Sequence, residues 1–201
     1  MLMSLDLTQR LKVANPTELD KATFELDSKK VETLLKEEQV VELSYNFFEE
    51  HVLSLGCYSF YKVIATFEVL LKDPRYKLQH DALHLLSDFD WFTREHNDIE
   101  QLKTILKIRP EFANFKDDKG NLPLHHAIRR FDVAVADCMD IDDVSKEEAL
   151  EFVSMYITEL MSKTDDIESR NNDGKSVLDL MPKGYRRYLK KQLTAINKAK
   201  I

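Results

Sequence analysis

The feature that most restricts the fold of this chain is a short pattern that occurs twice. The segment NFKDDKGNLPLHHA (114–127) aligns without gaps with ESRNNDGKSVLDLM (168–181), so that Gly120 falls on Gly174. In both copies a polar turn with a glycine leads into the start of a helix. A pattern that recurs in one chain is typical of a repeat protein, in which similar units stack and bury apolar faces that no single unit can hide.

The apolar residues of the two copies coincide as well. Leu124 falls on Leu178, and a shorter copy, DALHLL, places Leu83 over Leu124 and His84 over His125. The spacings between the three leucines are 41 and 54 residues, so the repeats are irregular.

Helical periodicity fills the segments between these copies. The segment DIEQLKTILKI carries an apolar stripe that Pro110 closes, and SFYKVIATFEVLLKD carries another that Pro74 ends. Ser145 and Glu148 form a capping box, which predicts a further helix start. With only four glycines and five prolines, the chain favours helices joined by turns. The two stripes consist of Phe60, Val63, Ile64, Phe67, Leu70 and Leu71, and of Ile99, Leu102, Ile105 and Leu106.

The repeated pattern resembles the ankyrin repeat family, whose signature is a hairpin loop with Asp-x-x-Gly followed by Thr-Pro-Leu-His-x-Ala. The best copy is 97–130, and the resemblance covers about 45–190. It departs from the family in its spacing, since family repeats recur every 33 residues, and in having Leu122 where the family has threonine. The surplus residues fall after Asp88 and after Phe131, where we expect lengthened connections.

The resemblance implies a structural role for the motif residues. Gly120 and Gly174 would take positive φ, and Pro123 would open a helix. Leu124 would be buried between units, and His125 would use its ring nitrogens on backbone groups of the loops.

We therefore expect an all-α fold, an ankyrin-like helix-pair solenoid with N- and C-terminal capping helices. The predicted boundaries are an N-terminal helical cap over 1–40, repeats over 41–182 and a basic C-terminal cap helix over 183–201, with Tyr188, Leu189, Leu193 and Ile196 facing inward. The repeats divide at about 41–75, 76–115, 116–168 and a partial 169–182.

Charge is distributed unevenly along the chain, whose formal net charge is -7. The segment 132–151 holds eight acidic residues and one lysine, and we interpret it as a solvated connection. The segment 183–201 holds seven Lys or Arg residues and no acid. The overall charge argues against a nucleic-acid binder, and no apolar run reaches the roughly 20 residues that a membrane span requires.

Neither cysteine, Cys57 or Cys138, has metal-ligand spacing, so we expect free thiols in a reducing compartment.

Metal and catalytic motifs are weak. His80 and His84 lie four residues apart on a predicted helix, with His96 as a candidate third ligand, but no H-E-x-x-H pattern surrounds them. The acidic segment lacks the glycine of a calcium loop. No nucleophile elbow or phosphate loop is present in the sequence. We expect no enzyme activity, no cofactor and no metal, with a His80/His84 metal site or enzyme as an alternative function.

The predicted function is that of a non-catalytic protein–protein interaction module. The resemblance implies binding through hairpin tips and the exposed side of the first helices, which form a concave surface. The expected contact residues are Lys116, Asp118, Lys119, Asn121, His126, Arg129, Arg130, Asn172, Asp173 and Lys175, with Trp91 as an aromatic anchor.

The partner is a protein of unknown identity, and we expect a monomeric, cytoplasmic module that does not bind nucleic acid. A secreted bacterial effector acting in the host cytoplasm is one setting for such irregular repeats. A second alternative is an acidic-surface or nucleic-acid binder that uses Arg186, Arg187, Lys190 and Lys191 of the basic helix.

Overall fold

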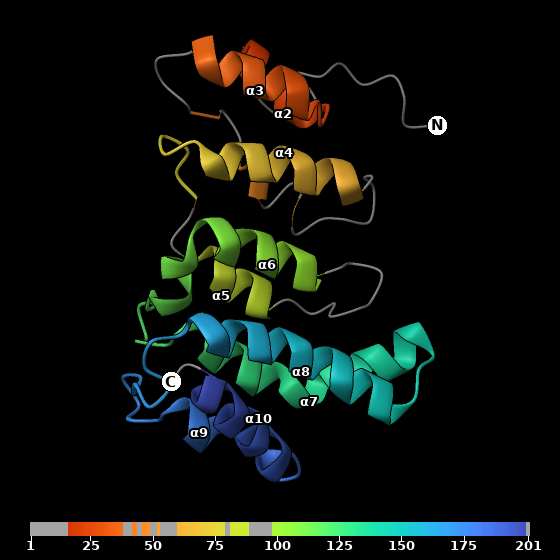
Figure 1. Ribbon diagram of the computed structural model, residues 1–201, viewed down its shortest axis with the longest axis vertical. Helices are drawn as coiled ribbons and strands as arrows, with labels where there is room; N and C mark the ends of the chain where they lie inside the picture. Colours follow the sequence, from red (N-terminus) through yellow and green to blue (C-terminus); the bar gives the residue numbers. More distant parts are fainter. Residues whose placement is uncertain are drawn as a thin grey trace. The chain divides into compact units, whose positions relative to one another are not determined.

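The computed structural model describes residues 16–37, 42–43, 46–48, 52, 60–78, 81–88 and 98–199. These residues are mostly helical and form no β-strand, which confirms the all-α class (Figure 1). An isolated antiparallel bridge joins Arg170 to Ser176. The chain divides into two compact units, 1–78 and 79–201, which are described one at a time.

The first unit contains α2 (Glu18–Phe24), α3 (Ser28–Glu37) and α4 (Phe60–Lys72). α3 packs against both α2 and α4. On α4, the predicted stripe is buried at Val63, Phe67, Leu70 and Leu71, whereas Ile64 is only half-buried. The rings of Phe47 and Phe48 pack on Phe67, with centroids 6.2 and 5.8 Å away. Most of the beginning of the first predicted repeat, 41–56, and Cys57 lie outside the described residues.

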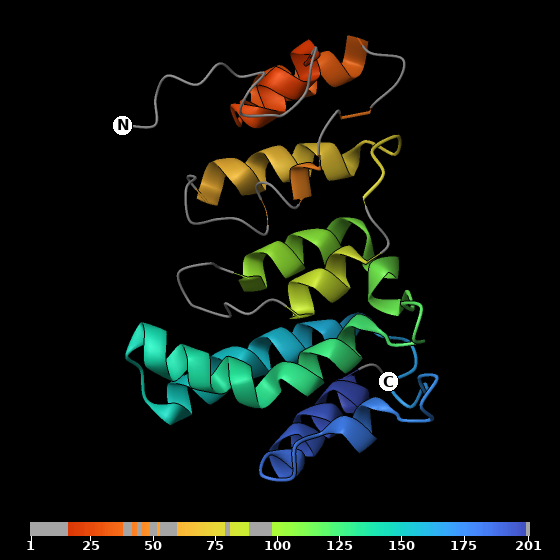
Figure 2. The ribbon, with the colours of Figure 1, turned by 180° about the vertical axis from the view of Figure 1, so that it is seen from behind.

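The second unit is built from helices that contact one another in two series. α5, α7 and α9 pack in that order, and α6, α8 and α10 pack in that order beside them (Figures 1 and 2). The elements are α5 (Ala82–Asp88), α6 (Asp98–Ile108), the 3-10 helix η3 (Pro110–Asn114), α7 (Pro123–Asp142), α8 (Lys146–Lys163), α9 (Val177–Leu180) and α10 (Arg186–Ala199).

Most of the predicted core positions of this unit are buried. Leu83 and Leu124, aligned in the sequence, are both 0% exposed. All four residues of the predicted α6 stripe are buried as well. Leu178, the third aligned leucine, is only half-buried, and the preceding Val177 is fully buried instead.

The interpretation of 132–151 as a connection is wrong, because α7 continues to Asp142 and α8 begins at Lys146. Ala134, Val135 and Cys138 are buried at helical spacing, while the acidic Asp132 and Asp140 remain exposed. The long spacing to the last repeat therefore comes mainly from long helices of 20 and 18 residues. In both views α7 and α8 reach past the ends of α5 and α6 (Figures 1 and 2).

The ends of α8 and α10 test two further predictions. The capping box at the start of α8 is confirmed, since Ser145 Oγ accepts from the Glu148 N–H at 3.3 Å and the Glu148 carboxylate accepts from the Ser145 N–H at 3.0 Å. On α10, Leu189 is buried as expected, but Tyr188 is 37% exposed, so the prediction that it points inward is wrong. None of the helices in the described ranges has the length and apolar character to cross a bilayer.

Candidate functional site

Two hairpin loops with the same hydrogen bonds form the framework of the candidate site. In the first loop, Asp117 Oδ1 accepts from the N–H groups of Lys119 and Asn121 at 2.9 and 2.7 Å. In the second, Asn171 Oδ1 accepts from Asp173 and Lys175 at 3.1 and 2.9 Å. The backbone bonds across each turn match too, including the bond from the glycine N–H to the carbonyl three residues earlier. The two aligned loops thus share these side-chain and backbone hydrogen bonds.

The two loops also bond directly to each other. The Asn172 N–H donates to the Lys119 carbonyl at 2.9 Å, and its Nδ2 donates to the Asp118 carbonyl at 3.1 Å. Asn171 Nδ2 donates to Asn121 Oδ1 at 2.8 Å. Loops some 50 residues apart in sequence are therefore held at a fixed spacing.

Gly120 and Gly174 both have φ of +74°, which confirms the prediction of positive φ. Residues with a side chain adopt this left-handed conformation only at a cost in free energy. The surroundings of the two glycines differ. A Cβ on Gly120 would lie 2.6 Å from Asn172 Oδ1, whereas a Cβ on Gly174 would meet nothing within 4 Å. Gly120 is thus required twice, by its backbone angle and by the second loop.

The buried histidines connect helices to loops as the repeat pattern predicts. His125 Nδ1 accepts from the Leu122 N–H at 3.1 Å, and its Nε2–H donates to the Lys175 carbonyl at 3.3 Å. His84 Nε2–H donates to the Asn121 carbonyl at 2.9 Å, which is the equivalent atom one loop earlier. A carbonyl only accepts, so Nε2 carries the proton in both rings. Burial lowers the pKa of His84 and of His125, which favours these neutral forms.

The last copy uses a carboxylate where the others use histidine. Asp179 Oδ2 accepts from the Ser176 N–H at 3.0 Å, while Ser176 Oγ accepts from the Asp179 N–H at 3.3 Å. This capping box begins α9 and replaces the contact to a following loop.

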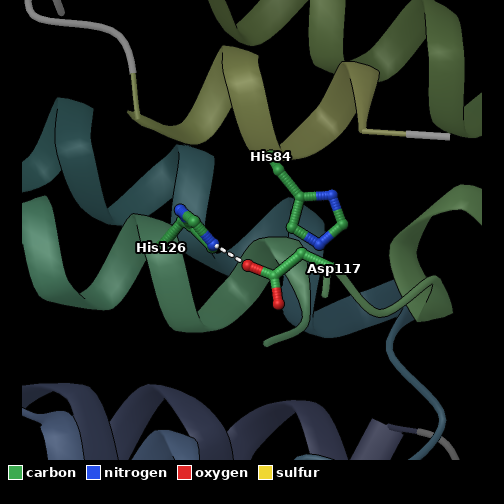
Figure 3. A group of neighbouring side chains, drawn as sticks. All are labelled: His84, Asp117 and His126. Atoms are coloured by element: carbon green, nitrogen blue, oxygen red, sulfur yellow. Dashed lines mark hydrogen bonds and ion pairs between the residues drawn. The ribbon is translucent and has the colours of Figure 1, made fainter. Parts of the chain in front are cut away.

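A second group of polar side chains lies beside this framework. His84 on α5, Asp117 at the start of the first loop and His126 on α7 converge, as Figure 3 shows. One potential metal-ligand atom from each lies within 4.8 Å of the other two. His126 Nε2–H donates to Asp117 Oδ2 at 2.9 Å, and the rings of His84 and His126 meet edge to face, 5.2 Å between centroids.

The electrostatics of the group favour an ionised Asp117 carboxylate and a neutral His84 ring. Burial raises the pKa of Asp117, but hydrogen bonds from Asn121 and His126 outweigh it and hold that pKa well below its usual range. His84, by contrast, is 4% exposed and has its pKa lowered by burial. The side chains of His126 and Asp117 keep 12% and 15% of their surface exposed, so solvent reaches one side of the group.

The predicted contact residues fall into three sets. Asn121 is 1% exposed and its side chain is taken up between the loops, so the prediction that it contacts a partner is wrong. His126 and Arg130 are half-buried, and Trp91 lies outside the described residues, as do His80 and His96. The exposed set is Lys116, Asp118, Lys119, Arg129, Asn172, Asp173 and Lys175.

The sequence alone does not single out His84, Asp117 and His126 as a set. Nine residues separate Asp117 from His126, and His84 comes from another helix, so only the packing of α5 on α7 brings them together. Cys138 is buried and its sulfur is not part of a disulfide, as expected.

Comparison with known proteins gives no family for the chain, since no family model, curated protein or solved structure matches it.

Proposed function

We propose that the chain is an ankyrin-like, non-catalytic module that binds a partner protein through the hairpin tips and the exposed side of the first helices, α5, α7 and α9. The observation that carries this proposal is the identical bonding of the two loops together with their direct connection. Because hydrogen bonds hold neighbouring hairpin loops at a fixed distance, the loops together present a continuous, preorganised edge. Preorganisation lowers the entropy cost of binding.

The exposed residues of this edge support a partner with an acidic surface. Among the predicted contact residues, Lys116, Lys119, Arg129 and Lys175 are exposed against two exposed carboxylates, Asp118 and Asp173, although the chain as a whole carries a net charge of -7. A local excess of positive charge on an acidic protein steers association with a partner of complementary charge.

The bonding of His125 supports a structural role for the centre of the motif. Both of its ring nitrogens are engaged by backbone groups, the Leu122 N–H and the Lys175 carbonyl. Neither nitrogen is left to act as a general base, which fits a scaffold for binding.

The test is charge reversal at two exposed positions, Lys119→Glu and Arg129→Glu, in one variant. Arg130 is a poorer choice, because it lines a small internal cavity beside Tyr156 and its reversal would disturb folding. Pull-down with quantitative mass spectrometry should show a set of acidic partners that is lost with the double reversal at unchanged circular dichroism.

The matched control is Lys190→Glu with Lys191→Glu on α10, which changes the charge equally on a different exposed surface. The control should keep the partners. Loss of binding in this control, with retention in the Lys119/Arg129 variant, would refute the loop edge and favour an acidic-surface or nucleic-acid binder acting through the basic helix.

A further inference from the structure

We propose that His84, Asp117 and His126 form a binding site for a divalent transition metal, for which Zn²⁺ is the probe. The donor set is two imidazoles and one carboxylate, a combination that holds zinc in sites with an open fourth position. The three side chains belong to one compact unit and come from α5, from α7 and from the loop that precedes α7.

The geometry is close to what a metal needs. Zinc takes nitrogen and oxygen ligands at about 2.0–2.2 Å, which places the ligand atoms of a tetrahedral site about 3.3 Å apart. The His126 and Asp117 atoms are already 2.9 Å apart, and all three ligand atoms lie within 4.8 Å of one another. Figure 3 shows the three side chains as they lie without a metal; a rotation of the half-buried His126 side chain and a small adjustment of His84 would close the remaining difference.

The surroundings orient the carboxylate. Asp117 Oδ1 is held by the N–H groups of Lys119 and Asn121, and Oδ2 accepts from Asn121 Nδ2 at 3.0 Å. Hydrogen bonds of this kind fix a ligand in place and account for much of the affinity of metal sites. The partial exposure of Asp117 and His126 leaves water as the fourth ligand.

Binding changes the tautomer of both imidazole rings and releases no proton. His126 Nε2 gives up the proton that it donates to Asp117, and His84 Nε2 gives up the one that it donates to the Asn121 carbonyl. In each ring the proton moves to Nδ1, and the metal takes the Nε2 lone pair. Because the bond from His84 to the loop is lost, metal binding and the loop compete for this ring.

The experiment titrates metal-free full-length protein with Zn²⁺ by calorimetry and by competition with a chromophoric chelator. Wild type should bind one equivalent, His126→Ala should lose at least ~10-fold in affinity, and Asp117→Asn should do the same. Asp117→Asn is informative because Asn171 holds the same loop bonds with an amide at the equivalent position, so the loop should keep its fold.

Two control variants distinguish this group from three of the four other histidines of the chain, His80, His96 and His125. His125→Ala removes a histidine with the same loop bonds but outside the group, and it should bind Zn²⁺ like wild type. His80→Ala with His96→Ala should also bind like wild type. Loss of binding in that pair, with retention in His126→Ala, would replace this site with the one that the sequence spacing suggested.

A spectroscopic readout reports the change of tautomer directly. Long-range ¹⁵N–¹H spectra of the histidine rings should show His84 and His126 changing to the Nδ1–H form on addition of Zn²⁺, with His125 unchanged. Absence of one-equivalent binding, or binding with no change in these two rings, overturns the proposal.

Discussion

Replacing Gly120 with alanine tests the loop framework at the point where it carries two constraints. The variant places a Cβ on a residue with φ of +74°, which costs about 1–2 kcal/mol at any loop position of this kind. The same Cβ would lie 2.6 Å from Asn172 Oδ1 and 3.2 Å from the Asn172 backbone nitrogen.

Relieving this clash weakens hydrogen bonds between the two loops. Asn172 must move, and its bonds to the carbonyls of Asp118 and Lys119, each worth about 1 kcal/mol, weaken or break. The total loss of unfolding free energy is therefore about 2–4 kcal/mol.

Gly174→Ala is the matched control, since it has the same φ and no atom within 4 Å of the added Cβ. Its cost should stay at about 1–2 kcal/mol, and the entropy that alanine removes from the unfolded chain is common to both variants. Urea unfolding followed by far-ultraviolet circular dichroism measures the difference.

Equal losses in the two glycine variants would refute the idea that the second loop packs on the first. A further check is Asn172→Ala, which removes the clashing oxygen. In that background the excess cost of Gly120→Ala over Gly174→Ala should shrink, leaving only the part caused by the backbone nitrogen of residue 172 at 3.2 Å.

Three further results are expected from the second unit. Leu124→Ala should cost about 2–5 kcal/mol in urea unfolding and Leu178→Ala clearly less, because only the first is fully buried; equal costs would count against the burial described. Ser145→Ala should cost about 0.5–2 kcal/mol through loss of the cap, and a change within error would mean that the cap does not form in solution. Burial lowers the pKa of His125 below its unfolded value of about 6.5, so below that pH the unfolded chain binds more protons and stability falls on acidification. The slope between about pH 7.5 and 5 should be shallower in His125→Ala, and an unchanged slope would exclude this ring as a cause.

Features that depend on short stretches of chain could be predicted from the sequence. The positive φ of Gly120, the Pro123 helix start and the capping box at Ser145 all follow from residues within a few positions of one another. The bonds of His125 were also predictable, because the repeat pattern fixes which loop faces the ring.

Features that depend on packing between distant segments could not. The apolar face of the helix after Phe131 gives a weak periodic signal, because its buried residues Ala134, Val135 and Cys138 are few and small and lie among acidic residues. Asn121 is buried because its side chain accepts from Asn171 in a loop 50 residues later, a partner that local sequence does not reveal.

The reach of α7 and α8 past α5 and α6 has a consequence for how such a chain can change over time. The loop connections lie at the N-terminal end of α7, whereas the extra length lies at the other end, next to Asp143. Whole turns of about 5.4 Å can therefore be added to or removed from both helices together without shifting the register of the loops. Differences in repeat length among related proteins would then be found at the end of α7 next to Asp143.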